Sequence, residues 1–273
     1  MQFNNITSLA RIIILDGIRR HALLGLLLLS LFSEIMGLFF MDFISHDVGR
    51  ASSDFLFSIM WLAGLLFLFF HAVQVISWDE ERGVIYSILS RPLSRASYVI
   101  GVFSGLSVLL ILLHAILGIV ALSTLIWIQS MLDPTYFQTL SLPHFLLSWC
   151  GLVIAQLVVL SVVMLFSGLV RGGFPVLLLS VAYYAICTAL PTVRESLYQN
   201  AATTDTNGVA ALLLQILTAF FPDLTDLDYK NSVLIETLTT SYSNIAAHFL
   251  IASFYCVIMI ACACFAYNRR DLQ

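Results

Sequence analysis

Three ionisable side chains, Glu34, His71 and His114, stand inside long apolar runs of the sequence. An ionised group facing lipid at such a position costs about 2.5–3.5 kcal/mol, so residues of this kind are usually paired, neutral or functional. Gln74 and Gln156 are weaker polar positions in the same runs. We interpret the five as a candidate intramembrane path for a substrate. For Glu34, a structural hydrogen bond inside a helix bundle is the alternative interpretation.

A second polar feature is the stretch 78–95 (WDEERGVIYSILSRPLSR), which holds three acids and three arginines between two apolar runs. Apolar residues at helical spacing predict a short amphipathic helix within it. Arg91-Pro92 ends that helix, because proline disfavours α geometry at the residue before it. So short a helix is not stable alone. It must therefore pack either on the chain's own apolar helices or on a soluble partner that moves it.

The composition of the chain predicts what surrounds these residues. Of its 273 residues, 60% are hydrophobic and 10% are charged, whereas soluble domains have about 45–50% apolar and about 25% charged residues. This excludes an ordinary soluble domain and predicts a bilayer as the solvent, in which only helices and closed barrels satisfy their backbone. Continuous runs such as 23–29 (LLGLLLL) lack the alternation of barrel strands. We therefore expect an all-α integral membrane protein.

Six apolar runs are each long enough to cross a hydrocarbon core of about 30 Å as a helix. They cover residues 21–41, 54–77, 98–128, 144–170, 174–190 and 244–267. The third and fourth runs exceed the thickness of the core, so these helices must tilt or project into water. We predict one transmembrane domain, residues 1–273, with six transmembrane helices.

The orientation follows from the basic residues, because cytoplasmic loops are enriched in Lys and Arg. With the N-terminus inside, all of the twelve Lys and Arg residues except Arg50, Arg194 and Lys230 fall on the cytoplasmic side. The opposite orientation would invert this bias. We therefore predict a multi-pass protein of the inner (plasma) membrane with both termini in the cytoplasm. The segment 78–97, between the second and third spans, is then cytoplasmic as well.

Two segments outside the spans are also predicted to be helical. Residues 1–20 have apolar positions at helical spacing and arginines mostly off that face, which indicates a helix in the cytoplasmic interface. A plain extension of the first span is the alternative. Residues 209–221 (VAALLLQILTAFF) are too few for a span. We interpret them as a re-entrant or surface-lying helix in a large outer connection, residues 191–243.

The connection between the fourth and fifth spans is predicted to be a tight turn. Arg171-Gly172-Gly173 supplies one basic residue and two residues that are free to take positive φ. Pro175 follows at the start of the next helix, where a missing N–H has little consequence.

Residues 80–95 (EERGVIYSILSRPLSR), with Gly101 beyond them, resemble the coupling segment of type 2 ABC transporter permeases. The resemblance is strongest to the NosY-like branch linked to multicopper-enzyme maturation. Val84 replaces the threonine usual in the family, and Val102 replaces a lysine. The similarity extends over nearly the whole chain, through residues 165–168 (LFSG), 221–231 (FPDLTDLDYKN) and 267–272 (YNRRDL).

The resemblance implies a homodimer, or pseudo-dimer, of six-span subunits bound to two cytoplasmic ATPases. The chain has no Gly-rich Lys-Ser/Thr phosphate loop, so ATP and Mg²⁺ are expected on the partner ATPase. We expect no catalysis, metal or cofactor in this chain and no nucleic-acid partner. The expected partners are the ATPase, a second permease copy, the lipid bilayer and a periplasmic or accessory subunit. The residues assigned to ATPase coupling are Asp79, Glu80, Glu81, Arg82, Tyr86, Ser87, Ser90, Arg91, Pro92 and Arg95.

Two other classes of membrane protein are alternatives. An enzyme acting on lipid needs a catalytic cluster at one membrane face, and the outer connection offers Asp223, Asp226 and Asp228 with no histidine before His248. We interpret these acids as a solvated outer face. An ion-coupled secondary transporter favours broken spans and inverted repeats, neither of which is evident in the sequence. The sequence therefore favours the membrane subunit of an ATP-driven, exporter-type ABC complex.

Overall fold

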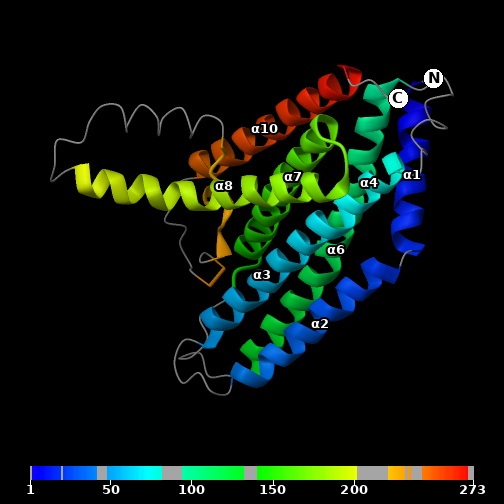
Figure 1. Ribbon diagram of the computed structural model, residues 1–273. Coiled ribbons are helices and arrows are strands. Elements are labelled where there is room, and N and C mark those ends of the chain that lie inside the picture. Colours follow the sequence, from blue (N-terminus) through cyan, green and yellow to red (C-terminus); the bar gives the residue numbers. More distant parts are fainter. Residues whose placement is uncertain are drawn as a thin grey trace.

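The computed structural model describes residues 2–19, 21–41, 48–81, 94–131, 140–201, 221–230, 233–234 and 242–269. Every regular element within these ranges is helical (Figure 1), as predicted. The α-helices are α1 (Gln2–Arg19), α2 (His21–Met41), α3 (Val48–Leu66), α4 (Val73–Glu81), α6 (Arg95–Met131), α7 (Leu142–Leu169), α8 (Gly173–Ala201) and α10 (Tyr242–Arg269). A π-helical segment, η1 (Phe67–Ala72), joins α3 to α4, and a short 3-10 helix, η2 (Thr225–Leu227), precedes α10.

Within the described residues, five helical stretches are long and apolar enough to cross a membrane. They are Val48–Trp78, Arg95–Met131, Leu142–Leu169, Gly173–Ser196 and Ser243–Arg269. Each coincides with one of the predicted spans from the second to the sixth. The predicted first span is also helical, as α2, with a shorter apolar stretch at Leu24–Gly37. With 37 residues, α6 is about 55 Å long, which exceeds a hydrocarbon core of about 30 Å.

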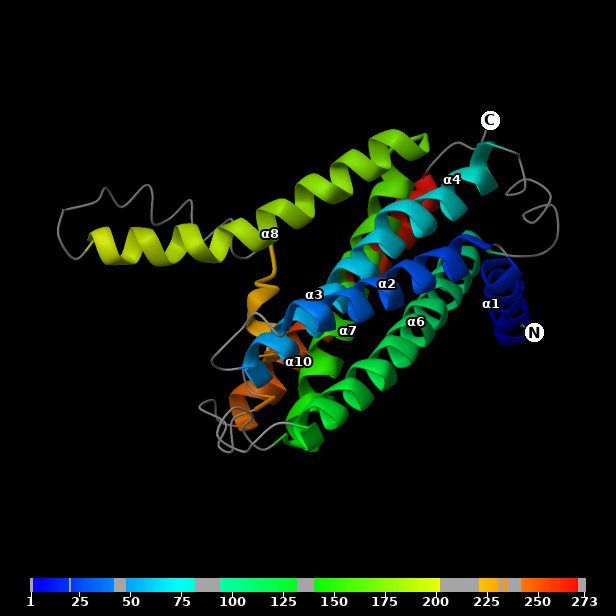
Figure 2. The same ribbon diagram turned by 90° about the horizontal axis from the view of Figure 1, so that it is seen from below.

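Neighbouring helices of the bundle run antiparallel in some pairs and parallel in others. α6 and α7 run antiparallel, whereas α7 and α10 run parallel, so that Gly168 near the end of α7 meets Ala266 near the end of α10. As a result, α4, α7 and α10 end, and α6 and α8 begin, at one end of the bundle, where both chain termini also lie (Figures 1 and 2). We call this the terminal end and the opposite one the distal end.

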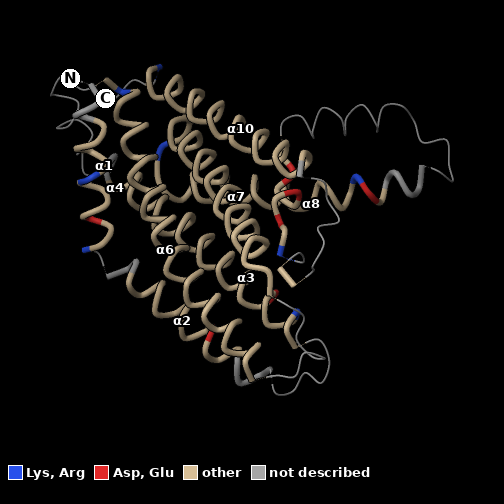
Figure 3. Tube along the Cα trace, turned by 180° about the vertical axis from the view of Figure 1, so that it is seen from behind, with Lys and Arg blue, Asp and Glu red and all other residues tan. Residues whose placement is uncertain are grey.

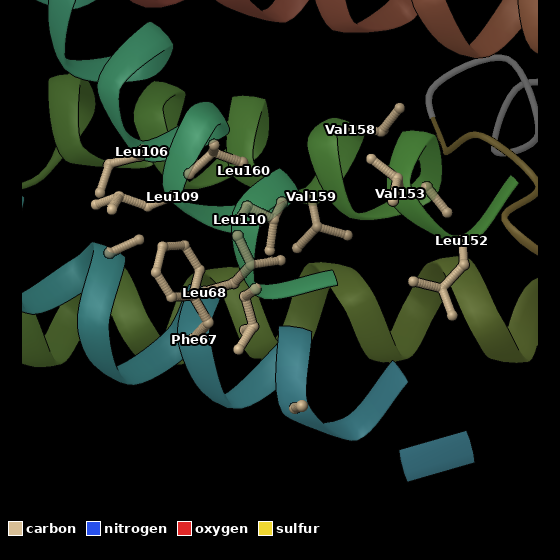
Figure 4. Packing of buried hydrophobic residues seen from close by; sticks show 14 of the residues in the cluster. Phe67, Leu68, Leu106, Leu109, Leu110, Leu152, Val153, Val158, Val159 and Leu160 are labelled. Carbon is tan, nitrogen blue, oxygen red and sulfur yellow. The ribbon is translucent and has the colours of Figure 1, made fainter. Parts of the chain in front are cut away.

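The core lies where α6, α7 and the η1 segment meet. Phe67 and Leu68 of η1 belong to one buried cluster with Leu109 and Leu110 of α6 and with Leu160 of α7 (Figure 4). All five side chains are inaccessible to solvent. Because η1 contributes two of these side chains, the π-helical turn packs at the centre of the bundle rather than at its surface.

The outward faces of α8 and α10 are apolar and uncovered. Only 17% of the apolar stretch of α8 and 11% of that of α10 are buried. Leu250, Phe254 and Val257 of α10 are each more than 60% exposed. Soluble monomers rarely expose contiguous apolar patches of more than a few hundred Å². These faces are compatible with a multi-pass membrane protein.

Helix α1 confirms the predicted helical segment before the first span and packs along α6. Leu9 contacts Gly101 and Ile13 contacts Gly105, so the two helices run in the same direction. Ile13 and Gly17 are buried in this contact. The absent side chains at Gly101 and Gly105 let the helices approach closely, a common device between helices in membranes. The position of α1 in a membrane interface stays a prediction.

Helix α8 differs from the prediction at its second half. The fifth span was expected to end at residue 190, but the helix continues through Pro191 to Ala201. Proline removes one backbone hydrogen bond, which a long apolar helix tolerates when its other bonds remain. The helix leaves the direction of the bundle and extends beyond it (Figures 1 and 2). The expected outer connection therefore begins at least ten residues later than predicted.

The tight turn before α8 is confirmed. Gly172 has a φ of +93°, in the region that favours glycine. Pro175 lies in the first turn of α8, as expected. Two other predictions fall largely outside the described residues: the surface-lying helix at 209–221, of which only Phe221 is described, and the coupling helix, of which residues 82–93 are not.

We expect Gly105→Leu to destabilise the fold by about 1–3 kcal/mol through overpacking. A Cβ atom at this position would lie 2.9 Å from Ile13 Cβ and 3.2 Å from the Ala10 carbonyl oxygen. Thermal unfolding in detergent measures the loss, and faster tryptic cleavage at Arg11 reports the release of α1. Gly25→Leu is the control, because a Cβ at Gly25 has nothing within 4 Å. Equal loss in both variants would contradict the α1–α6 contact.

Candidate functional site

The structure brings together two of the five polar residues predicted inside the apolar runs. His114 of α6 and Gln156 of α7 are both 0% exposed, and His114 Nε2 lies 2.6 Å from Gln156 Oε1. The amide oxygen is an acceptor, so the hydrogen bond assigns the proton of a neutral imidazole to Nε2. The Gln156 amide nitrogen in turn donates to the Trp61 carbonyl oxygen at 3.1 Å. A buried polar chain therefore links α6, α7 and α3.

Two glycines make room for this polar chain. A Cβ atom at Gly64 of α3 would fall within 1.7 Å of Gln156 Oε1. A Cβ atom at Gly118 of α6 would fall 2.8 Å from the indole nitrogen of Trp149, which donates to the His114 carbonyl oxygen at 3.0 Å. Any larger residue at Gly64 would displace the amide, so the hydrogen bond depends on the glycine.

The polar chain reaches a fourth helix through an aromatic pair. The Trp61 indole nitrogen donates to the Tyr184 hydroxyl of α8 at 2.7 Å, and the two ring centroids are 6.4 Å apart. Trp61 and Tyr184 carry no functional signal in the sequence, because an aromatic residue in an apolar run is ordinarily only part of the core. Four helices thus meet around one hydrogen-bonded group, which we call the polar layer: His114, Gln156, Trp61, Trp149 and Tyr184.

A cavity of ≈ 250 Å³ adjoins the polar layer on its distal side. Trp61 and Tyr184 belong to both the polar layer and the lining of the cavity, and the segment 224–230 closes it. The lining combines aromatic and aliphatic walls with hydroxyl and charged groups: Phe57, Ser58, Trp61, Ser148, Leu152, Tyr184, Thr188, Leu224, Thr225, Leu227, Asp228 and Lys230. Apolar pockets with a few convergent polar groups are the usual form of a small-molecule site.

The segment 221–230, which contains the short 3-10 helix η2, is held against α7 and α8 by polar contacts. The Ser148 hydroxyl donates to the Tyr229 carbonyl oxygen at 2.7 Å. Asp223 accepts from the Thr225 backbone N–H at 3.0 Å and pairs with Arg194 at 3.4 Å. These bonds keep the wall of the cavity closed against α7 and α8.

The three acids of this segment, Asp223, Asp226 and Asp228, have different roles. Asp223 orders the segment, and Asp228 pairs with Lys230 at 3.5 Å. The pKa of Asp226 is raised, first by loss of hydration and then by the nearby Asp223 carboxylate. Among the described residues, no group of three or more His, Cys, Asp or Glu is arranged to hold a metal ion.

The other predicted intramembrane residues do not join the polar layer. Glu34 of α2 is 2% exposed, and neither of its carboxylate oxygens has a hydrogen-bond partner in the described part of the chain. His71 lies in η1 against the Phe67 ring, at 5.1 Å between centroids. Gln74 is exposed and lines a separate hollow of ≈ 350 Å³ with Trp78. The predicted path is therefore divided between separate places in the bundle.

The last residue assigned to coupling, Arg95, joins α6 to the end of α10. Its Nη1 donates to the carbonyl oxygens of Tyr267 at 3.2 Å and Asn268 at 3.1 Å. Tyr267 is itself buried, and its hydroxyl lies 3.0 Å from Ser167 Oγ. A guanidinium is favourable beside these carbonyls, because the C-terminus of a helix carries partial negative charge.

The remaining residues assigned to coupling lie either at the end of α4 or outside the described residues. Asp79, Glu80 and Glu81 form the last turn of α4, at the terminal end of the bundle. Arg82, Tyr86, Ser87, Ser90, Arg91 and Pro92 lie outside the described residues. Their assignment to coupling stays a prediction.

The chain was compared with protein-family models and with curated proteins. No family model and no curated protein matches it.

We expect the His114–Gln156 hydrogen bond to contribute about 0.6–1.7 kcal/mol of coupling, the range for polar pairs inside helical membrane proteins. A double-mutant cycle with His114→Phe and Gln156→Leu isolates the coupling free energy between the two side chains. The measurement is the free energy of unfolding in mixed micelles. His114→Phe with Ser123→Ala is the matched control, because the Ser123 hydroxyl bonds only to its own helix. Additive losses in the first cycle would contradict the pairing.

Proposed function

We propose that this chain is the membrane subunit of an ATP-driven, exporter-type complex of the type 2 ABC permease class. It would cross the inner membrane six times, with the terminal end in the cytoplasm. A separate ATPase would bind the segment 79–95 and supply the energy. A second copy of the chain would complete the permease, and the uncovered apolar face of α8 leaves a surface for it.

The distribution of charge supports the proposed orientation. Arginines gather at the terminal end of the bundle, on α1 and at the ends of α6, α7 and α10 (Figure 3). The described residues concerned are Arg11, Arg19, Arg95, Arg171 and Arg269. Acidic side chains predominate in the segment before α10 at the distal end. Basic residues favour the cytoplasmic side of a membrane, so this end is the one that would face the ATPase.

The contact of Arg95 carries the proposal. The acid-rich end of α4 and the start of α6 lie at the same end of the bundle, and Arg95 ties the start of α6 to the last carbonyls of α10. A force applied to the segment between Glu81 and Arg95 would therefore act on α4, α6 and α10 together. This is the mechanical connection that a subunit driven by an external ATPase requires.

The polar layer and the adjoining cavity are the best candidates for the substrate path. They lie between α3, α6, α7 and α8, so a change in the relative position of these helices would change the cavity. Glu34, His71 and Gln74 are proposed only as separate polar positions along the bundle.

We expect the double replacement Glu80→Ala and Glu81→Ala to weaken binding of the ATPase or to uncouple it, because the acids are proposed to meet the ATPase surface. The proposed partner is a soluble ATPase with a phosphate loop encoded in an adjacent gene, and the two would be co-expressed. Co-purification and the permease-dependent rate of ATP hydrolysis are the measurements. Glu195→Ala, at the far part of α8, is the control and should behave as the wild type. Full association and full coupling in the double variant would refute the assignment.

We expect Arg95→Gln to preserve membrane insertion and ATPase binding but to reduce the permease-dependent change in ATP hydrolysis. The reason is that α6 would lose its charged contact with α10. Arg95→Lys is the discriminating variant, because both observed bonds come from a single nitrogen and an ammonium can donate to the same two oxygens. It should retain most of the coupling. Equal loss in both variants, or no loss in Arg95→Gln, would contradict transmission through this contact.

A further inference from the structure

A groove runs between the last turns of α7 and α10 at the terminal end. It is an open surface groove of ≈ 770 Å³, lined by Leu165, Gly168, Leu169, Ile258, Ala261, Cys262, Phe265, Ala266 and Arg269. Three of the lining residues, Gly168, Ala261 and Ala266, have no side chain or only a methyl group. A Cβ atom at Gly168 would already lie 3.1 Å from the Ala266 Cβ, so the two helices are nearly in backbone contact there.

The length of the groove matches one leaflet of a bilayer. Residues 258–269 of α10 span about 17 Å at 1.5 Å per residue, roughly half of a hydrocarbon core of about 30 Å. With Arg269 excepted, every lining residue is apolar, small or a thiol. Such a hollow fits a single extended hydrocarbon chain, which would exchange contacts with neighbouring lipid for van der Waals contacts with the groove walls.

A positive charge stands at the end of the groove where a lipid headgroup would lie. Arg269 is in the last turn of α10, and its guanidinium carbon lies 4.3 Å from the centre of the Phe265 ring. Stacking on the ring holds the guanidinium above the groove while its N–H groups remain able to donate. Arg171 follows Leu169 by two residues and lies at the same end of the bundle. A guanidinium is well suited to a phosphate.

We propose that this groove binds an acyl chain of an anionic phospholipid of the terminal-end leaflet, with the phosphate held by Arg269. A second copy of the chain is a less suitable occupant. A two-fold dimer that placed groove against groove would bring the two Arg269 side chains together, since a two-fold interface apposes identical patches. The site does not depend on the proposed ATPase coupling and belongs to none of the residues assigned to it.

The first experiment measures retained lipid by native mass spectrometry. The full chain, purified from nanodiscs of phosphatidylglycerol and phosphatidylcholine, should carry phosphatidylglycerol preferentially. Arg269→Gln should lower the phosphatidylglycerol-bound fraction about five-fold, the equivalent of about 1 kcal/mol per basic residue at an anionic surface. Arg19→Gln, on α1, is the charge control and should have no effect. An unchanged bound fraction in Arg269→Gln would overturn the proposal.

The second experiment tests the apolar part of the site. Ala261→Trp fills the groove and should remove the bound lipid whatever its headgroup. Ile251→Trp, at a 62% exposed position of α10 that does not line the groove, should retain it. Retention of lipid by Ala261→Trp, or a lipid-free dimer that this variant disrupts, would overturn the proposal.

A measurement on the wild-type protein avoids any loss of folding in the variants. Cys262 is exposed and lines the groove, whereas Cys150 lies on α7 away from it. Adding phosphatidylglycerol to delipidated protein in detergent should slow alkylation of Cys262 by N-ethylmaleimide and leave that of Cys150 unchanged. Equal rates at Cys262 with and without the lipid would contradict occupation of the groove.

Discussion

The close approach of helices at positions without a side chain is the constraint on which the rest of this bundle depends. In a hydrocarbon solvent, apolar side chains gain little by leaving lipid for one another, so helices associate through tight packing and internal polar contacts. α1 meets α6 at Gly101 and Gly105, and α7 meets α10 at Gly168. At Gly64, the missing side chain admits a polar group instead of another helix. The same local feature therefore serves both packing and the placement of the polar layer.

The polar layer has a structural consequence that does not depend on the proposed transport. A buried amide without partners would destabilise the bundle, but Gln156 is satisfied at both ends by His114 and by the Trp61 carbonyl oxygen. Its bonds join helices α3, α6 and α7, and the Trp61–Tyr184 bond adds α8. A rearrangement of these helices would have to break these hydrogen bonds together and replace them with others. Such a set favours a small number of discrete arrangements over gradual deformation.

Hydropathy predicted the helical stretches well, because the requirement for an unbroken apolar run is local in sequence. The pairing of His114 with Gln156 was not predictable, since the two residues are 42 positions apart and meet only through the register of two antiparallel helices. The π-helical turn at His71 and the continuation of α8 through Pro191 also escaped prediction. Both features depend on tertiary packing. Contacts with neighbouring helices compensate for a local irregularity that residue propensities alone would predict to end the helix.

Two arginines at the end of the bundle show why charge counts alone could not assign their roles. Arg95 turns toward backbone carbonyls and joins two helices, whereas Arg269, on the second of those helices, lies over an aromatic ring beside an apolar groove. Both count equally in the excess of basic residues from which the membrane orientation is predicted. Because the carbonyl of Asn268, which Arg95 binds, immediately precedes Arg269, a displacement of the start of α6 would also move the mouth of the groove. A lipid held there would bear directly on the helix end through which coupling is proposed to act.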